Sequence, residues 1–196
     1  VGEYAHPTLP ALLHLPGYGA VAREGQGTAD ESLLVVRCGE FWGHYHLDQG
    51  SFWWWCRGRL ICADSELGDG RLKFAHEGHS VLGYPGRIPM QYFDRVPYQV
   101  DQCQRLDDVV TIRCRIPVHS WQIAPLRDQP IPVDRRPLDV RTFQWRAPDH
   151  LRIVDEPANS PDGKVTWTLH VRDLHRRRQP RRPGHRGNAG GAARIH

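Results

Sequence analysis

Residues 51–63 read SFWWWCRGRLICA, two apolar runs that are separated by Arg57-Gly58. A short polar pair ending in glycine between two such runs is typical of a β-hairpin. Both runs are apolar on both strand faces, as expected where a sheet is covered on both sides. Successive side chains of a strand alternate faces, so the three tryptophans at 53–55 cannot all point one way, and we expect core packing for them. The stretch therefore predicts the central hairpin of a β-sheet core.

Further strand-like runs occur on both sides of this hairpin. They alternate or are rich in β-branched residues, and glycine, proline, asparagine or aspartate bound them. The glycine-rich segment 24–30 predicts a hairpin connection, whereas residues 1–15 predict a leading segment or a short helical turn around 10–13. This spacing predicts an all-β fold, an antiparallel two-layer β-sandwich that covers residues 1–171. The runs are Ala20–Arg23, Ser32–Arg37, Val109–Ile116, Leu138–Trp145, His150–Asp155 and Lys164–Val171.

The basic character of the chain is confined to its C-terminal end. The formal net charge is +4, but residues 175–196 hold seven arginines and no acidic residue, which leaves −3 for the rest. Residues 172–196 have no hydrophobic period and bury too little surface to offset the entropy of ordering, so we expect a disordered Arg/Gly/Pro-rich tail. The folded part therefore gives no reason to expect specific binding of nucleic acid.

The five cysteines show no CxxC spacing, and an odd number leaves one unpaired under full oxidation. We therefore expect free thiols that pack as small apolar residues, with a cross-strand pair between Cys56 and Cys62 as the alternative. The longest apolar run is far shorter than the roughly 20 residues that a membrane-spanning helix needs. The sequence therefore predicts no membrane span.

The segment just before the hairpin carries the clearest chemical signal, His44-Tyr45-His46-Leu47-Asp48. In an extended chain His44, His46 and Asp48 project to one side, and Tyr45 projects to the other. Two imidazoles and a carboxylate are donors that a borderline metal such as zinc takes up. The alternative interpretation is a pair of solvated or hydrogen-bonded histidines.

An ordered series of short motifs surrounds this segment. LPGYG at 15–19 and ESLLV at 31–35 lead into GHYHLDQGSF at 43–52, and RGRLICAD at 57–64 and the His-Ser pair at 79–80 follow. The series resembles the C-terminal β-sheet domain of the heparinase II/III-like polysaccharide lyases. The resemblance covers roughly residues 12–171, is specific at its centre and is loose at its flanks.

The resemblance implies a zinc-type site made by His46, Asp64 and His79. It also implies that His44, the first histidine of the pair, faces the substrate and helps to position or deprotonate the sugar. The chain departs from the family pattern after Asp64, where Ser65-Glu66 stands instead of an early glycine. This departure bears on the local turn and on the identity of the ligand.

Several neighbouring residues are alternatives or additions to this set. His76 competes with His79 for the third ligand position, and Asp48 is either a ligand or an acceptor for an imidazole. Indole and phenol rings stack on sugars, so Trp42 and Tyr45, beside the histidines, are the candidates for substrate binding. His44 is alternatively a group that orients His46 or Asp48.

The resemblance implies the β half of a lyase that cleaves acidic, uronate-containing polysaccharides by β-elimination. Its remaining catalytic groups would lie on an upstream helical toroid domain that this chain lacks, and its location would be periplasmic or extracellular. One alternative is a non-catalytic polysaccharide-binding module with a structural metal. A cupin-like metalloprotein is a further alternative, but the glutamate that normally follows its His-x-His pair is missing at 49–51.

Overall fold

The structure of the chain is a computed structural model that describes residues 7–39, 48–64, 78–83, 99–117, 138–157 and 166–171. These residues form strands and connecting turns, and the described part contains no helix. Accordingly, no described helix is long and apolar enough to cross a membrane. The tail at 172–196 lies outside the described residues, so its disorder stays a prediction.

The first sheet is a five-stranded antiparallel meander, in which each strand pairs with the next one along the chain. Its central hairpin is the one expected at 51–63, with Arg57 and Gly58 in the turn at positive φ, 50° and 69°. Two consecutive residues with positive φ match the right-handed twist of a tight hairpin. The strands are β1 (Leu12–Leu15), β2 (Gly19–Glu24), β3 (Ser32–Arg37), β4 (Phe52–Cys56) and β5 (Arg59–Cys62).

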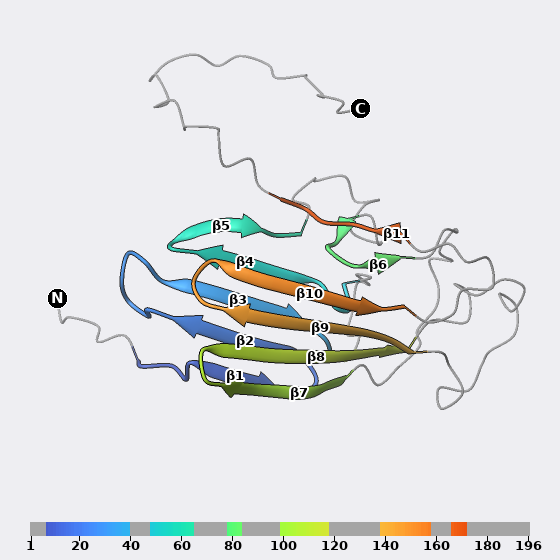
Figure 1. Ribbon diagram of the computed structural model, residues 1–196, viewed down its shortest axis with the longest axis horizontal. Helices are drawn as coiled ribbons and strands as arrows, with labels where there is room; N and C mark the ends of the chain where they lie inside the picture. The colour runs from blue at the N-terminus through green and yellow to red at the C-terminus, as the bar shows by residue number, and fades with distance from the viewer. Residues whose placement is uncertain are drawn as a thin grey trace, which may run out of the picture.

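The second sheet has four antiparallel strands in the order β10-β9-β8-β7. Two further strands of two residues each, β6 (Leu82–Gly83) and β11 (Thr166–Trp167), pair with each other beside the first sheet (Figure 1). The long strands of the second sheet are β7 (Gln99–Leu106), β8 (Val109–Pro117), β9 (Leu138–Arg146) and β10 (His150–Glu156).

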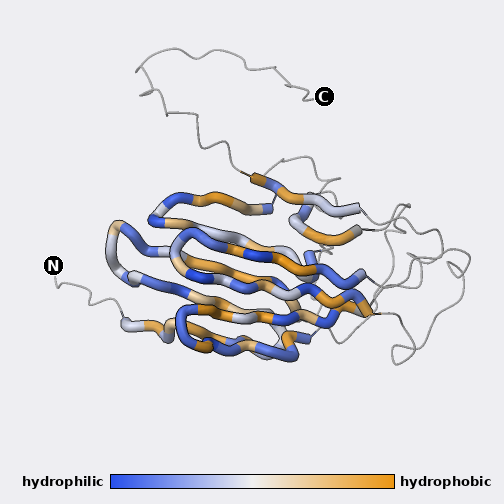
Figure 2. Tube along the Cα trace, viewed as in Figure 1, coloured by the Kyte–Doolittle hydropathy of each residue, from blue (hydrophilic) through white to orange (hydrophobic). Residues whose placement is uncertain are grey.

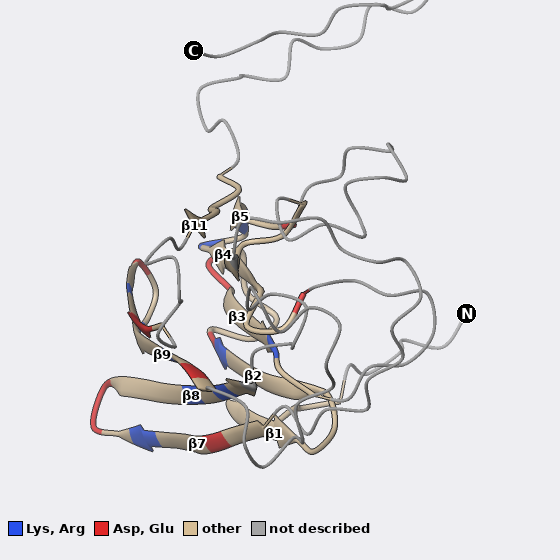
Figure 3. Ribbon diagram, turned by 90° about the vertical axis from the view of Figure 1, so that its right-hand side faces the viewer, with Lys and Arg blue, Asp and Glu red and all other residues tan. Residues whose placement is uncertain are grey.

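The two sheets form the two layers of a sandwich, seen from the end in Figure 3. The alternation that predicted the strands is what fills the core, because β3 and β9 bury every second residue. Across the layers, the rings of Phe52 and Phe143 meet edge to face at 5.3 Å between centroids. Figure 2 shows hydrophobic and hydrophilic residues interspersed along the strands, with hydrophilic residues also at the turns. The predicted all-β, two-layer antiparallel sandwich is confirmed.

The tryptophans of β4 divide between the two faces of the first sheet. Trp54 packs against the buried core, whereas Trp53 and Trp55 lie opposite Val35 and Leu33 of β3 on the other face. The pairing of β4 with β5 shifts register between Trp54 and Trp55. Core packing therefore holds for one of the three indoles, and the other two are half-buried on the outer face.

Two strands differ from the sequence expectation. Residues 12–15, expected in a leading segment or helical turn, form β1 because they pair in register with residues 19–22 of β2. Residues 99–106 gave no clear strand pattern but form β7, beside β1 at the edges of the two sheets (Figure 1). An edge strand tolerates a polar sequence because only one side of it is covered.

Candidate metal centre

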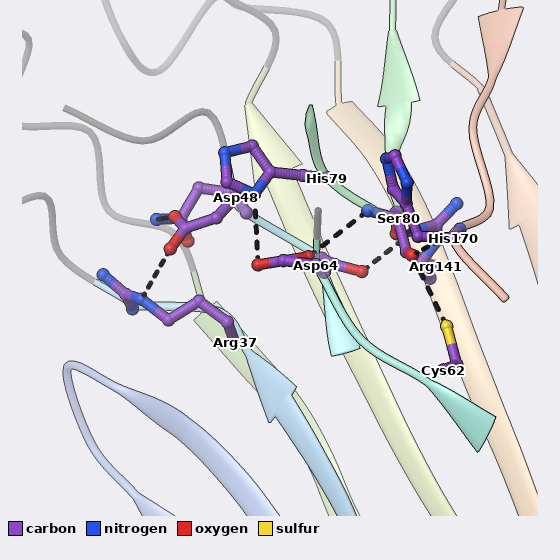
Figure 4. A network of polar contacts seen from close by, with 11 residues as sticks. Arg37, Asp48, Cys62, Asp64, His79, Ser80, Arg141 and His170 are labelled. Atoms are coloured by element: carbon purple, nitrogen blue, oxygen red, sulfur yellow. Dashed lines mark hydrogen bonds and ion pairs between the residues drawn. The ribbon is translucent and has the colours of Figure 1, made fainter. Parts of the chain in front are cut away.

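Asp64 lies at the end of the hairpin, two residues after the last residue of β5, and both of its carboxylate oxygens are engaged. Oδ1 accepts hydrogen bonds from the Ser51 hydroxyl and, at 3.5 Å, from the backbone N–H of Ser80. Oδ2 lies 3.1 Å from Nδ1 of His79 (Figure 4). The Asp64 side chain is 15% exposed and that of His79 is 3% exposed. The carboxylate is therefore fixed at one oxygen and presents the other to the imidazole.

The hairpin and one turn explain why these groups meet. Ser51 precedes β4 and Asp64 follows β5, so antiparallel pairing brings the two to the same end of the hairpin. The turn before Ser51 is tight, since the Ser51 N–H donates to the Asp48 carbonyl at 2.8 Å and Gly50 has a φ of +79°. Glycine adopts positive φ without strain. The turn that Gly50 allows is followed by Ser51, whose hydroxyl donates to Asp64.

Arg141 on β9 connects this end of the hairpin to the second sheet. Its guanidinium makes a bidentate pair with Asp155, at 2.6 and 3.0 Å. Its Nη1 also donates to the carbonyl of Gly50 at 2.9 Å and to the carbonyl of Ser80 at 2.6 Å. The side chain is 1% exposed. A buried cation with this many partners is a fixed structural anchor.

Asp48 is drawn near His79 in Figure 4, and its carboxylate forms an ion pair with a cation. Its Oδ2 is 3.6 Å from Nε of Arg37, whose guanidinium also donates to the Tyr18 carbonyl and lies over the Tyr18 ring. The side-chain oxygen of the adjacent Gln49 accepts a hydrogen bond from the backbone N–H of Gly39 at 2.9 Å. The structure therefore pairs Asp48 with Arg37.

Ser80 extends the network towards β5 and the C-terminal segment. Its hydroxyl lies 3.5 Å from the Cys62 thiol and accepts a hydrogen bond from the backbone N–H of His170 at 3.1 Å. Burial is the main reason that the pKa of the Cys62 thiol is raised. The Cys62 thiol is therefore a neutral neighbour of the Asp64 carboxylate. All five cysteines are free, so the alternative pair between Cys56 and Cys62 does not form.

The separation of the two facing donor atoms fits a shared metal ion. Zinc binds nitrogen and oxygen at about 2.0–2.1 Å in tetrahedral geometry, so two of its ligand atoms are about 3.3 Å apart. The observed 3.1 Å between Oδ2 of Asp64 and Nδ1 of His79 is close to that separation. A ligating carboxylate is commonly oriented by donors at its other oxygen, as Ser51 and Ser80 do here.

The other members of the expected site lie outside the described residues: Trp42, His44, Tyr45, His46 and the competing His76. Within the described ranges, no group of three or more His, Cys, Asp or Glu side chains is close enough to hold a metal ion. The structure therefore brings together two of the three expected ligands, Asp64 and His79, and the roles of the remaining residues stay predictions.

Sequence reasoning missed the residues that support this pair, namely Ser51, Ser80 and Arg141. For Arg141 a signal was present, because an arginine stands at an inward position of a strand whose later inward residues are Phe143 and Trp145. A charge on the buried face of a strand needs a specific partner.

The chain was compared with known families, curated proteins and solved structures. No family model matches it, and no curated protein matches it. It is similar to the solved structure of a heparinase III, the BT4657 gene product, with 16% sequence identity and a TM-score of 0.48. The similarity covers 79% of this chain and 22% of that one, so the chain spans about a fifth of the length of the heparinase III.

Proposed function

We propose that the chain is the β-sandwich part of a metal-containing polysaccharide lyase that cleaves acidic, uronate-containing polysaccharides by β-elimination. The observation that carries this proposal is the contact between Asp64 and His79, 3.1 Å between Oδ2 and Nδ1. These are two of the three positions to which the sequence resemblance assigns a metal, and they are 15 residues apart in the chain. The same resemblance favours a periplasmic or extracellular location.

Asp64, His79 and His46 would hold the metal, with zinc as the first candidate. Bound zinc supplies a fixed positive charge at the end of the hairpin. The deep position of His79 favours a supporting role for the centre, because a side chain that is 3% exposed is not placed to touch a polymer. The groups that contact sugar would then be those next to His46 in the sequence.

His44 would act as the base of the reaction, since the pKa of a histidine is readily tuned towards working pH. The base removes the proton at C5, α to the uronate carboxylate, and the electron pair forms the C4–C5 double bond. The bond from C4 to the glycosidic oxygen breaks, and that oxygen takes up a proton. Trp42 and Tyr45 would hold the sugar rings by stacking.

The remaining groups, which neutralise the uronate carboxylate and protonate the leaving oxygen, would come from a helical toroid domain upstream of this chain. A site that lacks these groups loses most of the benefit of positioning. We therefore expect the 196-residue chain alone to be weakly active or inactive.

The test is a screen of the chain, with and without its upstream region, on a panel of acidic polysaccharides. The unsaturated uronic end absorbs in the near ultraviolet and reports cleavage directly. We expect turnover only with the upstream region present, and its loss in His44→Ala but not in His150→Ala, a control on the exposed start of β10. If a gel that carries a polyuronate retains the longer protein but the polyuronate is not cleaved, the chain is a binding module with a structural metal.

A further inference from the structure

We propose that Arg141 is the positioning residue of the metal centre and that Asp155 holds it in place. This inference rests on the proposed function, because the centre is the one in which Asp64 and His79 would bind the metal. Arg141 donates hydrogen bonds to the backbone carbonyls of Gly50 and Ser80, and through them it acts on the two segments that orient these side chains.

The geometry links Arg141 to the carboxylate in two short paths. One path runs from Nη1 to the Gly50 carbonyl, and the next residue, Ser51, donates its hydroxyl to Oδ1 of Asp64. The other path runs from the same nitrogen to the carbonyl of Ser80, whose own N–H faces the same oxygen. A single guanidinium nitrogen therefore holds in place the two groups that donate hydrogen bonds to Asp64, the Ser51 hydroxyl and the Ser80 N–H.

The second path also reaches the imidazole, because His79 directly precedes Ser80. Fixing the Ser80 backbone fixes where the His79 side chain begins, and fixing Oδ1 fixes where Oδ2 points. Both ends of the 3.1 Å contact thus depend on Arg141. Without it, the segments at 48–51 and 78–81 would lose their common anchor on the second sheet.

The chemistry of the anchor explains why arginine stands here. An ion pair in the core commonly stabilises a fold no more than apolar residues of the same volume do. The fork of a guanidinium can pair with both oxygens of Asp155 and still donate to two carbonyls, which an ammonium group cannot do in this geometry. Asp155, at 16% exposed, lies directly opposite Arg141 on the neighbouring strand β10 and holds the fork there.

The first experiment measures zinc affinity by competition with a chelating dye, in the parent, Arg141→Lys and Asp155→Asn. The control is Arg113→Lys, which makes the same substitution in a more exposed pair on the same sheet, that of Arg113 with Asp101 at 2.8 Å. Loss of a residue that orients ligands weakens metal binding by about 10- to 100-fold. We expect that loss for Arg141→Lys, a change in the same direction for Asp155→Asn, and less than about a twofold change for the control.

The second experiment uses the metal-free protein and follows the His79 imidazole by nitrogen-15 NMR, with near-ultraviolet circular dichroism as the check of folding. In the parent, the proton should reside on Nδ1, which faces Asp64. In Asp155→Asn and Arg141→Lys the tautomers should mix, whereas Arg113→Lys should match the parent. Because Asp155→Asn keeps Arg141, this variant tests the inference on its own if Arg141→Lys does not fold.

The two experiments separate the inference from the proposed function. If the parent binds no zinc, the proposed metal function fails, and the NMR result alone decides the role of Arg141. The inference is overturned if folded Arg141→Lys or Asp155→Asn keeps both the parental zinc affinity and the parental His79 signals. It is equally overturned if Arg113→Lys changes them as much.

Discussion

The contact between Phe52 and Phe143 makes the sandwich itself testable by mutation. Phe52 is on β4 and Phe143 on β9, the two are 2% and 0% exposed, and their rings meet at 5.3 Å and 64°. Replacing either ring by leucine keeps most of the apolar volume and should cost less than about 1.5 kcal/mol each. Truncation of Phe143 to alanine should cost about 3–5 kcal/mol, because the cavity is only partly refilled.

An aromatic pair in this geometry contributes about 0.5–1.5 kcal/mol beyond the area that it buries. A double-mutant cycle of Phe52→Leu and Phe143→Leu should therefore show a coupling of that size in urea unfolding, followed by tryptophan fluorescence. The matched cycle pairs Phe143→Leu with Leu106→Ala, a 69% exposed position, and should be additive within about 0.5 kcal/mol. If the phenylalanine pair is equally additive, the two sheets do not pack through these rings.

Two further predictions concern backbone space and pH. Gly19→Ala should lower the free energy of unfolding by more than about 2 kcal/mol, since a Cβ would lie 1.9 Å from the Val36 carbonyl oxygen. The control is Gly17→Ala, where a Cβ would meet nothing within 4 Å, and it should cost only about 1–2 kcal/mol of backbone strain. Equal costs for the two variants would refute the pairing of β2 with β3. The Cys38 thiol and burial raise the pKa of Cys114 well above 9.0, so the unfolded chain loses this proton first and stability should fall as pH rises above about 9. The slope should be shallower in Cys114→Ala by up to about 1.4 kcal/mol per pH unit, and an unchanged slope in chemical denaturation would contradict this.

Much of the fold was predictable because burial alternates along its strands. Residues 138–146 alternate in burial and form β9 as expected, although the charged Asp139 and Arg141 occupy two of the inward positions. The exceptions have physical causes. β7 is polar because it is an edge strand, and β1 is only four residues long, too short to show a period after the preceding proline.

The candidate site was predictable only where its residues are part of short motifs. Asp64 and His79 were expected together from the resemblance, and the structure places them in contact. The inward position of Arg141 on β9 was a signal that it needs partners, but the sequence could not identify them, because Gly50 and Ser80 are 91 and 61 residues away. Backbone carbonyls leave no mark on residue identity, so only the folded chain reveals such contacts.

The central claim is that Asp64 and His79 share one metal ion with His46, and zinc content tests it most directly. The chain is loaded with zinc, dialysed and measured by elemental analysis in the parent, in alanine variants of these three residues, and in the control His150→Ala. The account predicts about one zinc per chain in the parent and the control, and about a tenth or less in each ligand variant, because the remaining donors cannot complete the coordination shell. Equal zinc content in the parent and in His46→Ala would contradict it.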